Sequence, residues 1–267
     1  MKAHIITSHG EPFEVFEIID LDTPRIRNDE VLVKVHYTSV NPVDCRIRKN
    51  AESNRDFPLV LGFDLYGEVV DTGTAMDDLT PGDHVIASPT PFAAGANAEY
   101  IAVKAQACLK VEGLDPVIGA AIPLVGITAY ESLFDRLQII KDQVVLIHAG
   151  AGVVGHLAIQ LAKNAGCSVI TTASREQSID LCRRLGADHV INYKNESVST
   201  AVEQITNGRG VSCILDTVGG ETFLESLGCL RPCGHICTIL PAGIDDRSAN
   251  ANLLRNITVS YEFMGAS

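Results

Sequence analysis

Hydrophobic and polar residues alternate along several short segments of the first 110 residues. In Glu30–Tyr37, Val31, Val33 and Val35 occupy every second position, which is the period of a β-strand with one buried face. Similar expected strands, separated by turn sequences, lie at Phe13–Ile19, Gly67–Val70, His84–Ala87 and Glu99–Val103. This part of the chain is therefore predicted to be rich in β-strands, without a repeated helix between them.

From Pro116 onward, short apolar runs alternate with longer amphipathic ones. Residues 117–137 are predicted as helices broken by Pro123 and Gly126. Further strands are expected at Gln143–His148, Ser168–Ala173, His189–Asn192, Val211–Asp216, His235–Leu240 and Ile257–Phe263. Further helices are expected at Val153–Ala165, Arg175–Leu185, Val198–Asn207 and Glu221–Leu230, with Gly166, Gly186 and Gly208 as closing residues. The alternation predicts an α/β fold with a parallel sheet covered by helices on both faces.

The change of pattern predicts two domains, residues 1–115 and residues 116–267. The 267 residues carry 21 Lys and Arg against 33 Asp and Glu, a net charge of −12, and no basic run supports binding to nucleic acid. All apolar runs are well short of the roughly 18 residues that would span a membrane. The N-terminus begins on a strand-like stretch rather than an export signal. We therefore expect a cytoplasmic protein with neither nucleic acid nor membrane as partner.

The eight cysteines show no pair at the two-residue spacing of a zinc knuckle or a redox motif. Cys229, Cys233 and Cys237 are evenly spaced, but a turn at Pro232–Gly234 is expected to divide them between a helix end and a strand. Disulfides are rare in a reducing compartment. The cysteines are therefore predicted to be small buried hydrophobic residues.

The segment Ala149–Gly155 carries the sharpest local signal of the chain. It follows an expected strand, opens an expected helix and has glycine at positions 150, 152 and 155. In dinucleotide-binding turns of this kind, the first glycine permits a tight turn, the second lets a pyrophosphate approach, and the third packs helix on sheet. Amides at the start of the helix would face the phosphates; a glycine-rich turn without a ligand is the alternative.

The end of the second strand of this unit indicates which dinucleotide is bound. A site selective for NAD would place a carboxylate there to hold the ribose hydroxyls. This chain has Ala173, Ser174 and Arg175 instead, and a hydroxyl and a guanidinium attract a 2′-phosphate. We therefore expect NADPH, although Glu176 is close by and Arg175 also fits a solvated residue in the first turn of a helix.

A series of motifs in a fixed order resembles the medium-chain dehydrogenase/reductase superfamily, and within it the zinc-free quinone (or enone) oxidoreductases. The motifs are Val40–Asp44, Leu61–Gly67, Pro81–Val85, Ala98–Tyr100, Ala120–Tyr130, Ala149–Gly155 and Asp216–Gly220. Each is weak alone, but their order over nearly the whole chain is specific. The resemblance implies a Rossmann doubly wound parallel sheet, a β-rich N-terminal catalytic domain of the GroES-like type and a cofactor cleft between them.

The resemblance also implies roles for individual residues. Asn41 corresponds to a residue facing the nicotinamide ribose and Asp44 to one bracing that loop, and these two are the expected catalytic residues; turn formation around Pro42 is the alternative for both. Thr128 corresponds to a contact near the nicotinamide. The expected cofactor-binding residues are Asn41, Thr128, Gly150, Gly152, Val153, Val154, Gly155, Ser174, Arg175, Tyr193, Val218 and Gly219.

Two departures from the family pattern affect the cofactor site. Most relatives have glycine where Val153 stands, and valine would resist an unusual backbone angle there. The lysine usually found three residues after Ser174 is Gln177, which should weaken NADPH affinity.

The zinc-dependent relatives use a cysteine and a Gly-His-Glu stretch as ligands in the first domain. The corresponding positions here are Asn41 or its neighbour and Gly62-Phe63-Asp64, and a phenylalanine cannot ligate zinc. We therefore expect no metal. Without one, carbonyl polarisation for alcohol oxidation lacks its electrophile, whereas hydride transfer to a quinone or an α,β-unsaturated carbonyl remains feasible.

The predicted function is thus NADPH-dependent reduction of quinones or α,β-unsaturated carbonyls. Some family members have a tyrosine after the Asn-Pro-x-Asp motif, but residues 46–55 contain none, which leaves the proton donor open. The alternatives are a zinc-independent reductase of another enone, such as an acyl thioester, and an NADPH-binding sensor with little turnover. Relatives commonly form dimers through the last Rossmann strand, here expected within Ile257–Phe263. Family members usually continue for several tens of residues, so the first domain is expected to lack its C-terminal return segment.

Overall fold

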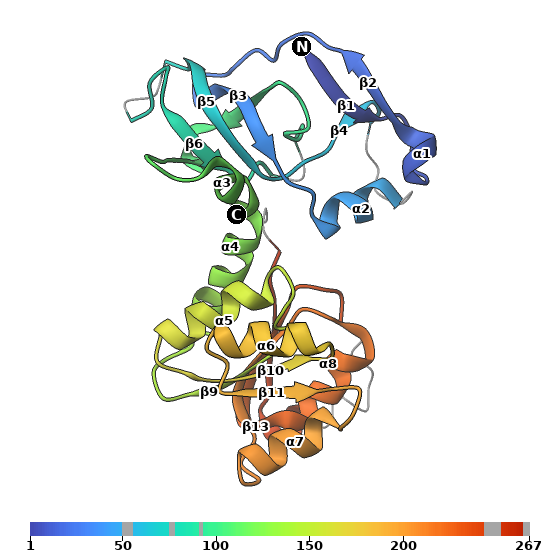
Figure 1. The fold of residues 1–267 in the computed structure, drawn as a ribbon, viewed down its shortest axis with the longest axis vertical. Coiled ribbons are helices and arrows are strands. Elements are labelled where there is room, and N and C mark those ends of the chain that lie inside the picture. The colour runs from blue at the N-terminus through green and yellow to red at the C-terminus, as the bar shows by residue number, and fades with distance from the viewer. Residues whose placement is uncertain (50–55, 75–77, 91–92, 243–251, 264–267) are drawn as a thin grey trace. The chain divides into compact units, whose positions relative to one another are not determined.

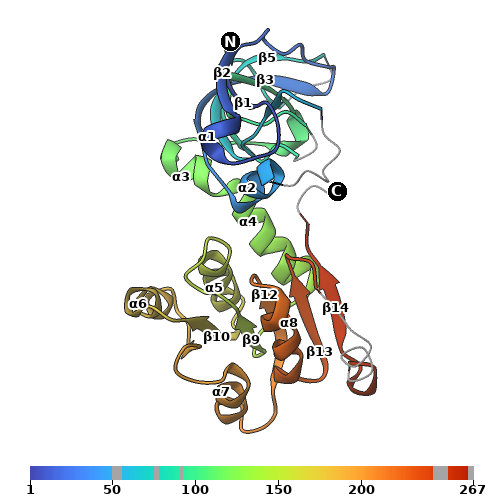
Figure 2. The same cartoon turned by 90° about the vertical axis from the view of Figure 1, so that its right-hand side faces the viewer.

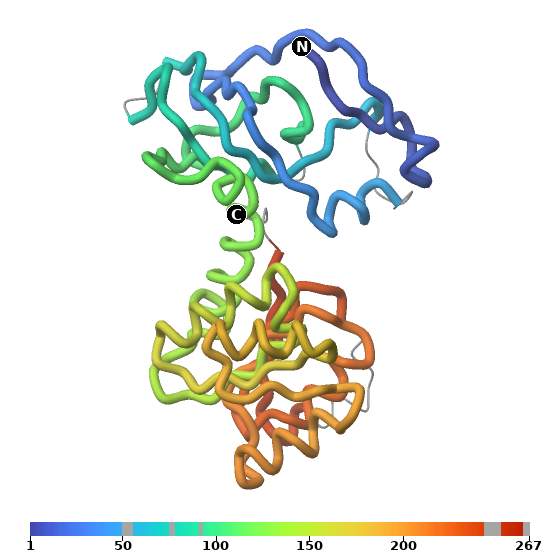
Figure 3. The backbone as a smooth tube through the Cα atoms, viewed as in Figure 1, coloured from blue at the N-terminus to red at the C-terminus, as the bar shows by residue number. Residues whose placement is uncertain are grey.

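The computed structural model describes residues 1–49, 56–74, 78–90, 93–242 and 252–263. It divides after Leu124 into two units, each with its own strands and core (Figures 1 and 3). The first unit contains two antiparallel sheets, and the second contains a parallel sheet with helices. The predicted α/β class is therefore confirmed.

Two β-sheets form the first unit, which runs from Met1 to Leu124. The smaller sheet pairs β1 (Lys2–Ile6) with β2 (Phe16–Asp20) and β4 (Leu59–Val60). The larger sheet has the order β7-β3-β5-β6-β8, with bounds Tyr100–Lys104, Glu30–Thr38, Leu65–Thr72, His84–Ala87 and Cys108–Lys110. A 3₁₀ turn, η1 (Ala105–Ala107), links β7 to β8. As the alternation predicts, Val31 and Val33 of β3 are fully buried in the core of this larger sheet.

Three short helices complete the first unit, and two of them differ from the prediction. The expected strand Phe13–Ile19 begins instead as a helix, α1 (Pro12–Val15), because proline at the first helical position is preorganised for a helical turn. The segment after Asn41, for which the sequence predicts no helix, forms α2 (Pro42–Lys49). The third helix, α3 (Pro116–Ala121), starts with Asp115 capping the amides of Val117 and Ile118.

The second unit is a six-stranded parallel sheet of order β11-β10-β9-β12-β13-β14 (Figure 2). Its strands are β9 (Val144–Ile147), β10 (Ser168–Ala173), β11 (His189–Asn192), β12 (Val211–Asp216), β13 (Leu230–Thr238) and β14 (Thr258–Tyr261). The order reverses between β9 and β12, which is the switch point at which doubly wound sheets bind ligands. The predicted Rossmann sheet is therefore confirmed, with β10, β11 and β12 at their predicted bounds.

Helices connect the parallel strands. They are α5 (Gly155–Asn164), α6 (Glu176–Arg184), α7 (Val198–Ile205) and α8 (Gly220–Ser226), followed by a 3₁₀ turn, η3 (Leu227–Cys229). Gly166, Gly186 and Gly208 have φ of +82°, +102° and +76°, as predicted for residues that close helices in the left-handed region. Because parallel crossovers are right-handed and the strand order reverses at β9, the pair α5 and α6 covers the face opposite to α7 and α8.

The chain enters the second unit through α4 (Pro123–Tyr130), which continues into a π-helix, η2 (Glu131–Arg136). Gly126 lies inside α4 and does not break it, contrary to the prediction, because a single helical glycine costs only about 1 kcal/mol. The strand β13 begins at Leu230, earlier than predicted, and so contains the expected turn at Pro232–Gly234. Cys233 has φ +58° there, which places the turn within the strand as an irregularity.

The prediction of buried cysteines is confirmed for five positions and wrong for two. Cys167, Cys182, Cys213, Cys229 and Cys237 are buried, Cys108 is half-buried, and none of the eight forms a disulfide. Cys45 and Cys233 are exposed. Cys45 lies on the outer side of α2, and Cys233 lies in the irregular start of β13, where neither side chain faces a core.

Candidate functional site

The turn from β9 to α5 has the backbone geometry that the glycine pattern predicts. Ala149 leaves the strand with φ +49°, and its amide donates to the Thr172 hydroxyl at 3.0 Å. The amide of Gly150 donates to the carbonyl oxygen of Thr172, also at 3.0 Å. The turn is thus fixed to β10 by two adjacent hydrogen bonds, both accepted by Thr172.

The three glycines of this turn serve two different purposes. A Cβ on Gly150 would lie 2.1 Å from the Thr171 hydroxyl oxygen, and one on Gly155 would lie 2.3 Å from the carbonyl oxygen of Ala149. Both are required by packing within the protein. A Cβ on Gly152 would approach only Ala149, at 3.0 Å from the same carbonyl oxygen, so the exposed face of Gly152 is open to a ligand.

The start of α5 offers backbone amides that have no acceptor among the residues the structure describes. After Gly152, the next amide that donates to a backbone oxygen is that of His156. It donates to the carbonyl oxygen of Gly152 at 3.0 Å. Within the described part of the chain, the amides of Val153, Val154 and Gly155 have no acceptor. Orphan amides at the positive end of a ten-residue helix form an anion-binding site. The turn therefore fits the pyrophosphate of a dinucleotide.

Val153 is compatible with this turn. Among the described residues other than glycine, φ is positive at six positions, and Val153 is not one of them. The strain expected for valine in place of glycine is therefore absent, because the left-handed angle falls on Ala149 instead. The Val153 side chain is 54% exposed and lies on the surface of the turn.

The ends of β10 and β11 bring together the predicted residues Ser174 and Tyr193. The Ser174 hydroxyl donates to the Tyr193 hydroxyl oxygen at 3.0 Å. Arg175 follows as the N-terminal capping position of α6, with an exposed side chain. Two hydroxyls and a guanidinium at adjacent strand ends have the donor chemistry to bind a phosphate.

The end of β12 positions Val218 and Gly219 through a buried carboxylate. One oxygen of Asp216 accepts from the amides of both residues at 3.0 Å. Its other oxygen accepts from the Thr238 hydroxyl at 2.9 Å. Gly219 has φ +75°, so glycine is needed for the chain to fold back over Asp216.

His148 lies between these strand ends and is almost completely buried, with 2% of its surface exposed. Its Nε2 atom donates to the Ser226 hydroxyl oxygen at 2.7 Å, because that hydroxyl itself donates to the carbonyl oxygen of Thr222. Its Nδ1 atom faces the Thr172 hydroxyl at 3.4 Å. Burial lowers the pKa of His148 to about 4, against a smaller opposing effect of Asp216. The ring is therefore neutral at pH 7.

The predicted residues Asn41 and Asp44 lie in the first unit, in a buried network with Ser39 and Asp64. The Asp44 carboxylate accepts from the amides of Asn41 at 2.7 Å and Gly62 at 2.8 Å. The Asn41 side-chain amide donates to Asp64 Oδ2 at 2.6 Å, and the Ser39 hydroxyl donates to the same oxygen at 2.6 Å. Asp44 thus links the Asn41 loop to Gly62, and Asp64 orients the Asn41 side chain.

Both carboxyl groups of this network are buried and accept several hydrogen bonds. Asp64 Oδ1 also accepts from the amide of Leu124 at 2.6 Å. Burial raises the pKa of Asp44 against the opposing effect of its backbone hydrogen bonds. Burial likewise raises the pKa of Asp64, against hydrogen bonds from Ser39, Leu124 and Asn41. Asp64 lies within the motif Leu61–Gly67, but it was not selected from the sequence as a site residue, because its partners are distant in the chain.

The remaining predicted residue, Thr128, is a buried residue of α4 in the second unit. Sequence reasoning also missed Thr172, His148 and Asp216, which support the turn and the strand ends from behind. All three lie at or next to the carboxyl ends of parallel strands, and this position is the signal that marks them.

The first unit's Phe63 is 1% exposed and packs in an apolar cluster with Ile6, Val15, Ile47 and Leu61.

Within the described residues, no group of three or more His, Cys, Asp or Glu side chains is placed to hold a metal ion. No described helix is long and apolar enough to cross a membrane.

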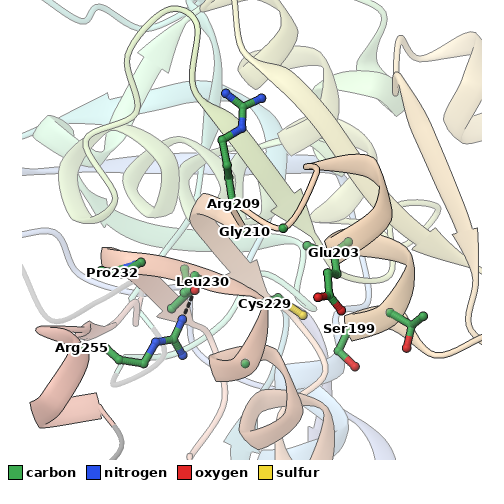
Figure 4. Close-up of a pocket in the computed structure, with 12 residues that line it drawn as sticks. Ser199, Glu203, Arg209, Gly210, Cys229, Leu230, Pro232 and Arg255 are labelled. Carbon is green, nitrogen blue, oxygen red and sulfur yellow. Dashed lines mark hydrogen bonds between the residues drawn. The ribbon is translucent and has the colours of Figure 1, made fainter.

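A separate cavity of about 320 Å³ lies at the amino ends of the parallel strands, where β12 and β13 begin (Figure 4). Its labelled lining includes Ser199, Glu203, Arg209 and Arg255, and Figure 4 shows Arg255 bonded to the carbonyl oxygen of Leu230. The predicted residues at the strand ends of this unit lie at the opposite, carboxyl ends of the strands. The cavity is thus distinct from the candidate cofactor site.

Two family models match the chain. Residues 27–113 match the alcohol dehydrogenase GroES-like domain, and residues 153–267 match the zinc-binding dehydrogenase domain. A zinc-type alcohol dehydrogenase-like protein of Staphylococcus aureus is 36% identical over 264 residues, which cover 96% of this chain and 77% of that protein.

Solved structures resemble both units. The quinone oxidoreductase from Coxiella burnetii is 32% identical with a TM-score of 0.86, and the match covers 98% of this chain and 82% of that one. The Escherichia coli quinone oxidoreductase, solved in complex with NADPH, is 26% identical with a TM-score of 0.88. That match covers 98% of this chain and 81% of the other.

Proposed function

The chain belongs to the medium-chain dehydrogenase/reductase superfamily, in its quinone oxidoreductase-like branch, and on this premise we propose that it is an NADPH-dependent reductase of quinones or α,β-unsaturated carbonyls. In this proposal residues 1–115 form the catalytic domain and residues 116–267 bind the cofactor. The observation that carries the proposal is the turn Ala149–Gly155, with its open Gly152 and the unbonded amides that follow.

The residues of the second unit would bind and orient NADPH. Bound NADPH would supply a hydride from its nicotinamide ring. The amides of Val153 and Val154 would hold the pyrophosphate, while Gly150, Gly152 and Gly155 give the turn its shape. Ser174, Tyr193 and Arg175 would hold the 2′-phosphate, supported by the 3.0 Å hydrogen bond between the two hydroxyls. Val218 and Gly219 would lie along the cofactor, and Thr128 near its nicotinamide.

The first unit would contribute Asn41 and Asp44 to the catalytic site. The Asn41 side chain is held by Asp64 and Ser39, and Asp44 fixes the backbone of its loop. We propose that this loop positions the nicotinamide ribose.

We further propose that the reaction needs no zinc. The buried Phe63 occupies the position at which zinc-dependent relatives have a histidine ligand, and its side chain is committed to the core cluster around Ile6 and Leu61. Reduction of a quinone or an enone moves charge onto an oxygen that water or a weak donor can protonate, so it does not require a Lewis acid.

A second function is an NADPH-binding sensor with little turnover. It is favoured by the absence of tyrosine from residues 46–55, where family members can carry a proton donor. A reductase of acyl-thioester enones is the alternative within the same chemistry.

The proposed assembly is a cytoplasmic homodimer. The strand β14 is one of the two edge strands of the parallel sheet. Tyr261 at its end and Phe263 two residues further on are half exposed, at 52% and 50%. Pairing of two such edges would protect them from aggregation. Eight free cysteines agree with a reducing compartment.

The test measures NADPH oxidation with benzoquinone and with a short enone as acceptors. We expect turnover with at least one acceptor and a lower rate with NADH. Tight NADPH binding without turnover on either acceptor would favour the sensor, and failure to bind NADPH would contradict both functions. Adding a strong zinc chelator should leave the rate unchanged; a loss of activity that zinc restores would refute the metal-free mechanism.

A further inference from the structure

The side-chain amide of Asn41 has both of its hydrogens bonded within the first unit. Its Nδ2 atom donates to Asp64 Oδ2 at 2.6 Å and to the Ser39 hydroxyl oxygen at 3.1 Å, and these two acceptors match the two hydrogens of the amide. The reverse orientation would place the Asn41 oxygen 2.6 Å from a carboxylate oxygen, where two acceptors repel. The nitrogen of Asn41 is therefore committed to the protein.

The carboxylate of Asp64 cannot turn away from this contact, because both of its oxygens are held. The residue is fully buried. Its Oδ1 atom accepts from the amide of Leu124, in the first turn of α4, at 2.6 Å. Its Oδ2 atom accepts from the Ser39 hydroxyl at 2.6 Å in addition to Asn41. Three donors favour the charged form of the carboxyl group, which therefore acts only as an acceptor.

The oxygen of the Asn41 amide is the atom left for a ligand. No described residue donates to Asn41 Oδ1. Although Asn41 as a whole is only 6% exposed, this oxygen is not among the fully buried side-chain atoms that lack a partner in the described part of the chain. The Oδ1 atom therefore reaches the surface of the first unit, while the Nδ2 atom faces inwards.

We propose that Asp64 is a positioning residue that makes Asn41 a hydrogen-bond acceptor in the cofactor site; this inference rests on the proposed function. Asn41 Oδ1 accepts from a hydroxyl of the nicotinamide ribose, so the position selects a ligand group that can donate. The same orientation excludes a second role for Asn41. Its nitrogen does not donate to the oxygen that becomes negative when a quinone or an enone accepts the hydride, and that stabilising group lies elsewhere.

Asparagine at position 64 would break this arrangement. Its amide has one acceptor and one donor group where the carboxylate has two acceptors. If the new nitrogen faced the Leu124 amide, it would meet a backbone donor that cannot rotate. The new nitrogen therefore faces Ser39 and Asn41, whose side chains can rotate, and the Asn41 amide is no longer held with its oxygen outwards.

The first test follows the Asn41 amide without cofactor, by nitrogen-15 NMR of protein labelled on asparagine. Both side-chain hydrogens of Asn41 should exchange with water about tenfold more slowly than those of the exposed Asn207. This protection should be lost in Asp64→Asn and kept in the matched control Asp71→Asn, an exposed residue of β5. Equal exchange of Asn41 and Asn207 in the wild type would overturn the proposal, whether or not the variant folds.

The second test is a double-mutant cycle on the dissociation constant of NADPH. Asp64→Asn and Asn41→Ala should each weaken binding about tenfold. The double variant should bind as Asn41→Ala does, because Asp64 acts through Asn41, and Asp71→Asn should bind like the wild type. If the factors of the two single variants multiply in the double variant, Asp64 affects binding independently of Asn41 and the proposal is wrong.

The two tests separate this proposal from the function on which it rests. A wild type that does not bind NADPH would contradict the proposed function and the ribose contact, while the exchange of the Asn41 amide still decides its orientation. A wild type that binds NADPH with an unprotected Asn41 amide would contradict the orientation alone. Ser39→Ala removes one of the two acceptors of the Asn41 amide and provides a second cycle, with the same expected result, if Asp64→Asn does not fold.

Discussion

The hydroxyl of Thr172 holds Ala149 in a backbone conformation that alanine rarely adopts. It accepts from the Ala149 amide at 3.0 Å while Ala149 has φ +49°. The carbonyl oxygen of the same threonine accepts from the next amide, that of Gly150. A single residue of β10 therefore fixes the point at which the chain leaves β9 and begins the proposed pyrophosphate-binding turn.

Replacement of Thr172 by valine should release this turn. The variant keeps the shape of the side chain but removes the acceptor for the Ala149 amide, so unfolding should become easier by about 2 kcal/mol. NADPH binding should weaken as well, because the turn is no longer preorganised. Urea unfolding and a fluorescence titration with NADPH measure the two effects. Thr172→Ser keeps the hydroxyl and should resemble the wild type; a valine variant with unchanged stability would contradict this account.

Replacement of Gly155 by alanine should lower stability, whereas replacement of Gly152 by alanine should lower NADPH affinity. At Gly155 the new Cβ would lie 2.3 Å from a backbone oxygen, so Gly155→Ala should lose about 1–3 kcal/mol of stability through overpacking. At Gly152 it would approach only Ala149, at 3.0 Å from the carbonyl oxygen and 3.9 Å from Cβ, so stability should change little while NADPH affinity falls. Thermal unfolding and NADPH dissociation constants separate the two variants. If Gly152→Ala binds NADPH as well as the wild type, the pyrophosphate does not lie over that glycine.

Reversing the charge at Arg175 should change the cofactor preference. Arg175→Asp removes a guanidinium from the proposed 2′-phosphate site and adds a repelling carboxylate. A charge-assisted hydrogen bond is worth about 1.5–3 kcal/mol, so the ratio of NADPH to NADH affinity should fall roughly tenfold to hundredfold. Dissociation constants measure this ratio even without turnover. Arg184→Asp, at the other end of α6, is the matched control; an unchanged ratio in Arg175→Asp would refute the assigned phosphate site.

His148 should make the protein sensitive to acid. Burial lowers its pKa to about 4 in the folded chain, whereas the unfolded chain has the ordinary value near 6.5. The neutral ring therefore contributes stability that is present above pH 6.5 and is lost as the pH falls through about 4. The difference between the folded and unfolded pKa values of His148 corresponds to roughly 3 kcal/mol of unfolding free energy. Unfolding free energies from pH 7 to pH 4 should decline more steeply in the wild type than in His148→Phe, with His189→Gln as the surface control. Equal slopes would show that His148 titrates normally.

Local patterns predicted most of the parallel sheet. The strands β10, β11 and β12 have their predicted bounds, and Gly166, Gly186 and Gly208 close helices with positive φ. These features depend on apolar runs and on glycine, which act over a few residues. The expected strand at Phe13 begins as α1 because Pro12 favours a helical turn. The helix α4 continues through Gly126 because one helical glycine costs only about 1 kcal/mol.

The residues that hold the candidate site in place could not be predicted from local patterns. Asp64 contacts the amide of Leu124, 60 residues away, and Thr172 contacts Ala149, 23 residues away. Such pairs arise from strand order and register, and no short motif contains both partners. The residues expected to touch the cofactor were found through their motifs, while those that hold them in place became visible only in the fold.

The exposed thiols of Cys45 and Cys233 provide two natural labelling sites for measuring a distance within this chain. One lies in the first unit and one in the second, whereas burial raises the pKa of the other six thiols and keeps them in the unreactive form. A donor and an acceptor dye attached to these two natural handles would report the separation of the units by energy transfer. Titrating NADPH into the doubly labelled protein would then show whether cofactor binding changes that separation, with no engineered cysteine.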